Sequence, residues 1–159
     1  DKLHYMGFPV FGLGLTEKKS FPYPYFSRDQ IEDFLSEINV LICLLPLTSE
    51  TEGILNLDLF MKCNPGTYLI NAARGKHLIE EDLIPALDKG YLSGAMLDVY
   101  RKEPLPEDHP FWGESRILCT PHIASVTNPE AASPQIIENF RRLKSNLDLL
   151  NIVDRDKGY

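Results

Sequence analysis

Arg74, Glu103 and His122 are the residues whose types and spacing point most directly to chemistry. Each follows a short apolar run of strand length, and the separations are 103 − 74 = 29 and 122 − 103 = 19 residues. A guanidinium can bind a carboxylate through two parallel hydrogen bonds, and an imidazole oriented by a carboxylate can exchange a proton near neutral pH. Together the three side chains indicate chemistry on a small oxyacid.

The elements that must position these residues are strands alternating with helices. Apolar runs of strand length occupy residues 8–12, 39–45, 67–71, 94–100 and 117–119. The longer runs lack polar alternation, which is typical of parallel strands covered on both faces. Four helices are predicted. The first follows the capping box of Ser27 and Gln30, and the second spans about 56–62 with Asn56 as its cap. The third spans about 81–89, and the last starts at Asn128. The alternation predicts an α/β fold with a Rossmann-like, doubly wound parallel sheet.

The predicted topology also gathers the polar residues. In such sheets ligands bind at the carboxyl ends of the strands. Arg74, Asp98, Glu103 and His122 all fall at or just beyond these ends. We therefore expect them on one edge of the sheet.

Two segments are expected within the chain. Residues 1–126 form a partial dinucleotide-binding domain, and residues 127–159 form a C-terminal helix and tail that return toward a substrate domain. Helix spacing places one apolar stripe on the last helix. The stripe consists of Ile136, Phe140, Leu143, Leu147 and Leu150.

Charge and cysteine content narrow the class of protein. The chain of 159 residues has a net charge of −7, without long blocks of either sign, which argues against a nucleic-acid partner. No apolar run reaches the roughly 18 residues that a membrane span needs. Cys43, Cys63 and Cys119 have apolar neighbours and no Cys-x-x-Cys spacing, which favours reduced thiols in a cytoplasmic protein and gives no metal site.

Four ordered motifs resemble those of D-isomer-specific 2-hydroxyacid dehydrogenases, and within that family those of the glyoxylate/hydroxypyruvate reductase A type. The motifs are Leu-Ile-Asn-Ala-Ala-Arg-Gly at 69–75, Gly-Ala-Met-Leu-Asp-Val-Tyr at 94–100, Glu-Pro-Leu-Pro at 103–106 and Thr-Pro-His-Ile-Ala at 120–124. The run from Leu44 to Thr51 and the closing Lys157-Gly158-Tyr159 agree with the reductase A type.

The resemblance implies a role for each site residue. Arg74 would hold the carboxylate of a small 2-keto acid and polarise its keto oxygen. His122 would donate the proton, and Glu103 would orient the imidazole. Asp98 would anchor the nicotinamide or its ribose. The residues expected to bind the cofactor are Pro46, Thr51, Ala72, Ala73, Arg74, Asp98, His122 and Ala124.

Several residues keep an alternative interpretation. Asp98 falls in an apolar run, where an unpaired carboxylate is costly, so a satisfied structural role competes with cofactor binding. His4, His77 and His109 have no comparable setting and are interpreted as ordinary polar residues. Trp112 either lines the substrate pocket or packs its loop onto the core.

The phosphate-binding loop is expected outside this chain. Gly12-Leu13-Gly14 lacks the third glycine of a dinucleotide fingerprint, because position 17 is Glu17. The resemblance places the Gly-rich loop, the central first strand and most of the substrate domain upstream. The chain is therefore expected to be the C-terminal half of a longer enzyme. No acidic residue favours NAD at the end of the second strand, and Lys18 or Lys19 could bind a 2′-phosphate, so NADP is preferred over NAD.

The leading hypothesis is an oxidoreductase that reduces a small 2-keto acid to the D-2-hydroxyacid, as a homodimer when full length. One alternative is a truncated, non-catalytic module that acts through protein contacts. Another is a cofactor-binding regulator without turnover. The missing Gly-rich loop favours the non-catalytic module, whereas the set of Arg74, Glu103 and His122 favours the enzyme.

Overall fold

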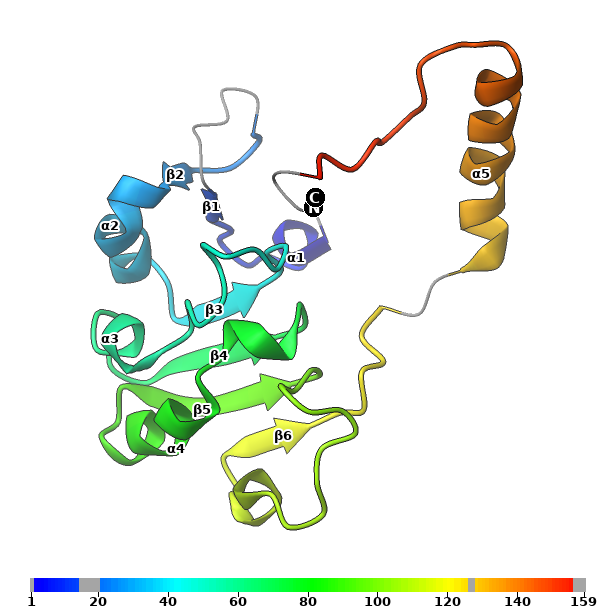
Figure 1. Cartoon of the computed structure of the whole chain (residues 1–159). Coiled ribbons are helices and arrows are strands. Elements are labelled where there is room, and N and C mark those ends of the chain that lie inside the picture. Colours follow the sequence, from blue (N-terminus) through cyan, green and yellow to red (C-terminus); the bar gives the residue numbers. More distant parts are fainter. Residues whose placement is uncertain (1, 15–20, 126–127, 156–159) are drawn as a thin grey trace.

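Parallel strands form the framework of the molecule (Figure 1). The computed structural model describes residues 2–14, 21–125 and 128–155. Two strands, β1 (Gly12–Gly14) and β2 (Tyr25–Ser27), pair in one sheet. A second sheet has the order β3 (Val40–Cys43), β4 (Thr67–Asn71), β5 (Leu92–Leu97) and β6 (Ile117–Cys119). The predicted α/β fold with a parallel, Rossmann-like sheet is confirmed.

Helices connect the strands, and polar side chains cap the starts of some of them. The α-helices are α1 (Lys2–Tyr5), α2 (Ile31–Ser36), α3 (Leu57–Phe60), α4 (Glu80–Asp88) and α5 (Pro129–Lys144). The Ser27 and Gln30 capping box opens a 3-10 turn that leads into α2, and the Asn56 side chain accepts from Leu59 N at 3.0 Å. Both predicted caps are therefore confirmed.

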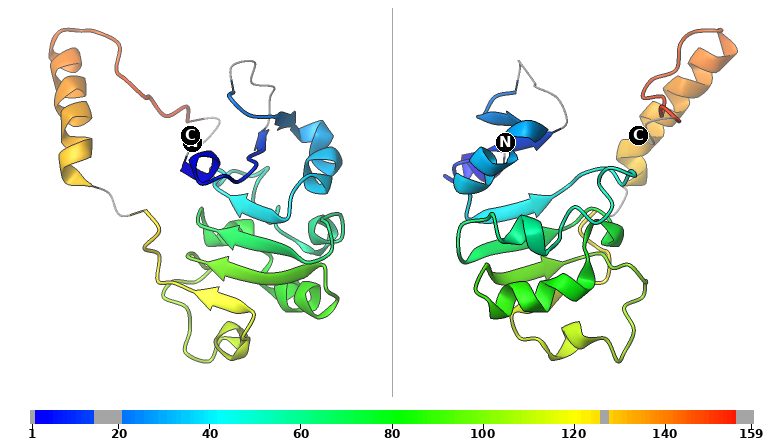
Figure 2. Two further views of the ribbon diagram at one scale, coloured as in Figure 1. Left: turned by 180° about the vertical axis from the view of Figure 1, so that it is seen from behind. Right: turned by 60° about the vertical axis from the view of Figure 1, so that its left-hand side comes forward.

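The core lies between the four-stranded sheet and helices α2, α3 and α4, which Figure 2 shows along the same side of the strands. Phe60, Leu69, Leu83 and Leu97 are fully buried there. Burial of each such side chain stabilises the fold by about 1.5–3 kcal/mol. This packing fixes the strands, and with them the loops that leave their carboxyl ends.

Some predicted boundaries are wrong. The first strand occupies Gly12–Gly14 instead of 8–12, and β2 follows a proline-rich stretch that gave no strand signal. The strand predicted at 94–100 lies at Leu92–Leu97, so Asp98 begins a loop. The last helix ends at Lys144, which leaves Leu147 and Leu150 outside the helical stripe. Asn146, with a φ of +53°, follows the end of the last helix, and hydrophobic periodicity does not detect such a turn.

The two faces of the sheet are unequally covered. Most residues of β4 and β5 are buried or half-buried on both faces of the sheet, as expected. In β3 and β6, alternate residues remain exposed, namely Val40, Ile42 and Leu118. The expectation that the longer strands are covered on both faces is therefore wrong for β3.

The sheets are separated between β1 and β3, which are not paired. A pocket of about 270 Å³ lies at this boundary, and its lining includes Phe11, Leu13, Phe34 and Ile42. The lining is almost wholly apolar. The central strand expected from the family resemblance stays a prediction.

Helix α5 stands apart from the sheets in Figures 1 and 2. None of its residues is buried, and Ile136, Phe140 and Leu143 are more than half exposed. The return of this segment toward a substrate domain stays a prediction. Among the described helices, none is both long and apolar enough to cross a membrane.

Candidate active site

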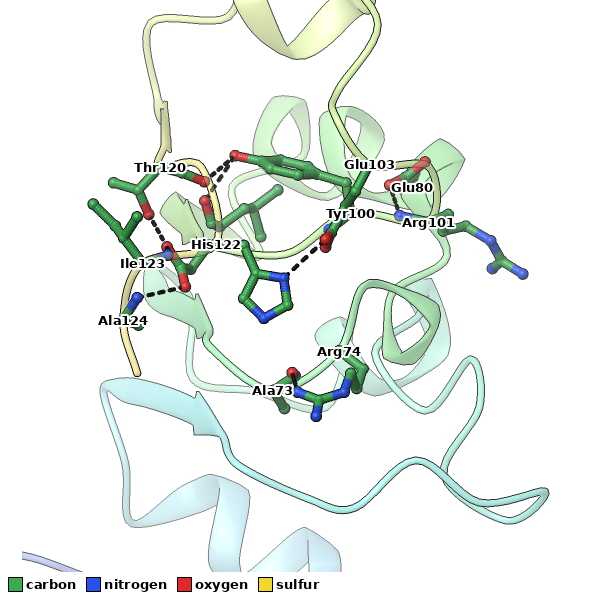
Figure 3. Close-up of polar contacts among 12 residues, drawn as sticks. Ala73, Arg74, Glu80, Tyr100, Arg101, Glu103, Thr120, His122, Ile123 and Ala124 are labelled. Carbon is green, nitrogen blue, oxygen red and sulfur yellow. Dashed lines mark hydrogen bonds and ion pairs between the residues drawn. The ribbon is translucent and has the colours of Figure 1, made fainter. Parts of the chain in front are cut away.

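The carboxyl ends of the four-stranded sheet carry the polar residues singled out from the sequence. Arg74 follows β4, Glu103 lies in the loop after β5, and His122 follows β6. Because the strands are parallel, these loops leave the same edge of the sheet. Figure 3 shows the three side chains together at this edge.

His122 and Glu103 form a direct pair. The Nδ1 atom of His122 lies 2.8 Å from Oε2 of Glu103. A carboxylate can only accept, so Nδ1 carries a proton and donates it to Glu103. Figure 3 shows the other ring nitrogen turned toward the side of Arg74. Nε2 is therefore the atom available for proton transfer.

The carboxylate of Glu103 is itself held in place. Its Oε1 accepts from the backbone N–H of Tyr100 at 3.0 Å. The hydrogen bond with His122 lowers the pKa of Glu103, burial raises it, and the Tyr100 amide and the charges of His122 and Arg74 lower it further. The net shift is downward, so Glu103 stays ionised beside the imidazole.

Arg74 lies at a tight turn between β4 and the 3-10 helix Gly75–His77. Its Nη1 donates to the carbonyl of Ala73 at 2.6 Å, and within the described part of the chain the other guanidinium nitrogens make no further hydrogen bond. A Cβ at Gly75 would overlap the backbone of Tyr100. This close approach joins the turn of Arg74 to the loop that carries Glu103.

Asp98 is almost completely buried, with 1% of its surface exposed. Its Oδ1 accepts from Thr120 Oγ1 at 2.5 Å and from Ile123 N at 2.9 Å, and its Oδ2 accepts from Ala124 N at 2.8 Å. The carboxylate is therefore satisfied within the protein, as the structural alternative expected. Contact with a cofactor stays a prediction.

The other residues predicted to bind the cofactor lie on the same edge. Pro46 and Thr51 follow β3, and the hydroxyl of Thr51 donates to the carbonyl of Pro46 at 2.7 Å. Ala72 is half-buried and Ala73 is buried at the end of β4. The structure brings these residues to one rim, and their contacts with a cofactor stay predictions.

His77 connects two of these loops and was misjudged from the sequence. It is fully buried, its Nδ1 accepts from Arg74 N at 3.3 Å, and its Nε2 lies 3.3 Å from the carbonyl of Pro46. The interpretation of His77 as an ordinary polar residue is therefore wrong. The sequence signal for this connecting role is the position of His77 three residues after Arg74, across a short turn.

His109 also has a defined structural role. Its Nδ1 accepts from Phe111 N at 3.3 Å, which caps the 3-10 helix Pro110–Gly113, and its Nε2 lies 3.7 Å from Glu80. His4 is exposed. The interpretation as an ordinary polar residue therefore fits His4 better than His109.

Trp112 lines a pocket beside the His122 and Glu103 pair. The pocket has a volume of about 430 Å³ and is also lined by Leu105 and Tyr100. The indole Nε1 donates to the carbonyl of Pro106 at 2.7 Å, and the residue is 57% exposed. The neighbouring Phe111, which is 2% exposed, anchors this loop in the core, so Trp112 does not perform that packing.

The glycines of Gly12-Leu13-Gly14 serve strand packing. A Cβ on Gly12 or Gly14 would collide with the side chain of Tyr25 on the neighbouring strand. This agrees with the rejection of a dinucleotide fingerprint at this position. The residues Glu17, Lys18 and Lys19 that bear on the fingerprint and on cofactor choice lie outside the described part of the chain.

Residues 1–124 match the sequence model of the NAD binding domain of D-isomer specific 2-hydroxyacid dehydrogenases. The chain belongs to this family. Among family members, the glyoxylate/hydroxypyruvate reductase A of Photorhabdus laumondii subsp. laumondii is 53% identical over 135 residues, which cover 85% of this chain and 43% of that protein. The corresponding enzyme of Serratia proteamaculans is 50% identical with the same coverage. The chain thus spans less than half the length of these curated relatives.

Solved structures of 2-hydroxyacid dehydrogenases have the same fold. The Xanthobacter autotrophicus enzyme in complex with NADPH and MES superposes with a TM-score of 0.94, 38% identity, and coverage of 99% of this chain and 66% of that one. The NADPH-dependent glyoxylate/hydroxypyruvate reductase of Sinorhizobium meliloti, in complex with NADP and sulfate, has a TM-score of 0.93 and 34% identity, with coverage of 99% and 52%. The edge that carries Arg74, Glu103 and His122 therefore belongs to a 2-hydroxyacid dehydrogenase fold.

Proposed function

We propose that the full-length protein reduces a small 2-keto acid, such as glyoxylate or hydroxypyruvate, to the D-2-hydroxyacid. The observation that carries the proposal is the 2.8 Å contact between His122 and Glu103 on the same sheet edge as Arg74. Relatives named glyoxylate/hydroxypyruvate reductase A support this substrate class.

Each side chain performs one part of the reaction. Arg74 binds the substrate carboxylate through its free guanidinium donors, with a planar geometry that lysine lacks. His122 delivers a proton from Nε2 to the keto oxygen, while Glu103 holds Nδ1–H and stabilises the charged ring. The nicotinamide cofactor, when bound, supplies the hydride.

The sheet edge fits the nicotinamide half of such a cofactor. Ala72 and Ala73, which have small side chains, directly precede Arg74 after β4, and Pro46 and Ala124 lie in the loops after β3 and β6. NADP is preferred over NAD, because related structures contain NADP or NADPH. Side-by-side kinetics with NADPH and NADH would test this preference.

Single substitutions in the full-length gene product test the assignment. His122→Ala should reduce kcat by about 10²–10⁴-fold, the range of general acid–base catalysis, and leave the affinity for NADPH unchanged. Arg74→Ala should mainly weaken 2-keto-acid binding and lower kcat/KM. The proposal would be contradicted if the wild-type protein reduced none of the 2-keto acids tested. It would also be contradicted if either variant had unchanged kinetics.

The second candidate is a truncated, non-catalytic module, and the absence of Gly-x-Gly-x-x-Gly from the printed sequence favours it. This module would show no turnover with either cofactor.

The enzyme proposal also includes a homodimer and a cytoplasmic setting. The free thiols of Cys43, Cys63 and Cys119 support the cytoplasmic setting. Sedimentation of the full-length product would test the dimer.

A further inference from the structure

The segment that carries His122 has few contacts of its own to hold it. Residues 121–125 are exposed and belong to no helix or strand. His122 adopts a φ of +55°, a left-handed conformation that is uncommon for a residue with a side chain. A catalytic imidazole needs a fixed direction, so an interaction from outside the segment has to stabilise this conformation.

Asp98 supplies that interaction. Its carboxylate accepts three hydrogen bonds, from Thr120 Oγ1 before His122 and from the backbone N–H groups of Ile123 and Ala124 after it. The three donors flank His122 on both sides, and Figure 3 shows them gathered beside the imidazole. Hydrogen bonds to an ionised carboxylate are about twice as strong as neutral ones.

We propose that Asp98 is a positioning residue for the proton donor: its carboxylate holds residues 120–124 against the end of β5 and so directs His122 toward Glu103. This inference rests on the proposed function only in naming His122 as the proton donor. It differs from the role that the family resemblance implied, which is direct contact of Asp98 with the cofactor.

The number of acceptor sites separates the two roles. A carboxylate offers about four lone-pair sites, and the segment 120–124 uses three of them. With 1% of Asp98 exposed, little of the carboxylate can reach another molecule. The observed contacts therefore support holding the loop more than holding a ligand.

The charge of Asp98 also favours this role. Burial raises the pKa of Asp98, but the hydrogen bonds from Thr120, Ile123 and Ala124 and the charge of His122 lower it, and the net shift is downward. Asp98 is thus ionised when the loop is formed. Two carboxylates, Asp98 and Glu103, face His122 from β5 and its loop, and Arg74 is the cation from β4.

Two substitutions in the full-length protein test the proposal. Asp98→Asn keeps one acceptor oxygen but places an amide NH2 where Ala124 N–H needs an acceptor, which releases the loop. We expect kcat to fall about 10²-fold, as for a misplaced catalytic group, while the NADPH Kd from fluorescence titration changes less than about twofold. A tenfold or greater weakening of NADPH binding with kcat unchanged at saturation would overturn the proposal.

Thr120→Val is the milder variant and guards against a folding failure in Asp98→Asn. It removes one donor to Asp98, and kcat should fall about tenfold. Thr120→Ser keeps the hydroxyl and should restore most of this loss. Equal losses in the Val and Ser variants would contradict the role of the hydrogen bond.

A readout without turnover separates this inference from the proposed function. In the NMR spectrum of the wild-type protein, the Nδ1–H proton of His122 should give a downfield resonance because it is bonded to Glu103. Asp98→Asn should broaden or remove this resonance, whereas an unchanged resonance would refute the positioning role. Lack of activity on every 2-keto acid would refute the proposed function and leave this measurement valid.

Discussion

A carboxylate beside an imidazole determines which ring nitrogen donates, and here Glu103 binds Nδ1 of His122. The same contact makes stability depend on pH. The hydrogen bond with His122 lowers the pKa of Glu103 from its ordinary value of 4.5. A group whose pKa is lowered on folding stabilises the protein above the unfolded value, and this stabilisation disappears as the pH falls through the folded value.

We therefore expect Glu103→Gln to reduce the free energy of unfolding above about pH 4.5, and the difference from the wild-type protein to shrink below that pH. The effect should be modest, because the His122 and Glu103 side chains are 46% and 37% exposed. Urea unfolding at a series of pH values measures it. Glu107→Gln removes an exposed carboxylate from the same loop and is the matched control. A pH-independent difference for Glu103→Gln would contradict this assignment.

Arg74 gives a second prediction at this scale. Arg74→Lys keeps the positive charge but loses the planar pair of donors. The lost bidentate contact should raise KM for the 2-keto acid and lower kcat/KM by about 10–10²-fold, the range of one or two charge-assisted hydrogen bonds. Steady-state kinetics with glyoxylate measures this. Wild-type kcat/KM in Arg74→Lys would show that charge alone suffices.

The types of the residues predict some features of the site and not others. The shared position of Arg74, Glu103 and His122 at one sheet edge could be predicted, because each follows a strand of a parallel sheet. The contacts of Asp98 with Thr120, and of His77 with Arg74 and Pro46, could not be predicted, because they join loops that are distant in sequence. A left-handed conformation at His122 carries no sequence signal, since glycine is its usual marker.

Among the elements, the loops at the carboxyl edge depend on close backbone packing. Gly75 lies where any Cβ would overlap the carbonyl group of Tyr100, so the turn after β4 can approach the loop after β5 only with glycine. Gly75→Ala should separate Arg74 from Glu103. We expect a loss of stability of about 1–3 kcal/mol, typical of overpacking, together with reduced kcat/KM.

The matched control for this prediction is Gly113→Ala. A Cβ at Gly113 meets no atom within 4 Å, so this variant should change stability by less than about 0.5 kcal/mol. Urea unfolding measures the stability of both variants, and steady-state kinetics measures their kcat/KM. Equal stability of Gly75→Ala and the wild-type protein would mean that the two loops separate without cost.

Element types were easier to predict than element ends. The strands at Thr67–Asn71 and Ile117–Cys119 were predicted with the observed bounds, because turn residues flank short apolar runs. The strand Tyr25–Ser27 was missed, because prolines precede it and its pairing with β1 is decided by tertiary contacts. Tyr25 on this strand packs against Gly12 and Gly14, which a local pattern cannot reveal.

For the whole molecule, the division between the two sheets matters most. The apolar pocket between β1 and β3 and the exposed residues of α5 are surfaces that a complete 2-hydroxyacid dehydrogenase would be expected to cover. The chain covers 43% of the Photorhabdus relative. The edge that carries Arg74, Glu103 and His122 is assembled by β4, β5 and β6, which lie on one side of the division.

This arrangement predicts a separation of catalytic geometry from cofactor affinity. In Rossmann-like domains the pyrophosphate of the cofactor binds to backbone N–H groups at a helix N-terminus, and Gly12 and Gly14 are instead packed against Tyr25. Loss of two charge-assisted hydrogen bonds weakens binding by at least about 100-fold. The 159-residue chain should therefore bind NADPH at least about 100-fold more weakly than the full-length gene product.

Fluorescence titration of both proteins with NADPH measures the difference, and circular dichroism of the 159-residue chain verifies that its fold is retained. In the folded chain, the contact between His122 and Glu103 should persist without cofactor, because residues of this chain alone make it. Equal NADPH affinity of the two proteins would place the phosphate-binding groups within the 159 residues. The sheet edge would then hold the whole cofactor without a Gly-rich loop.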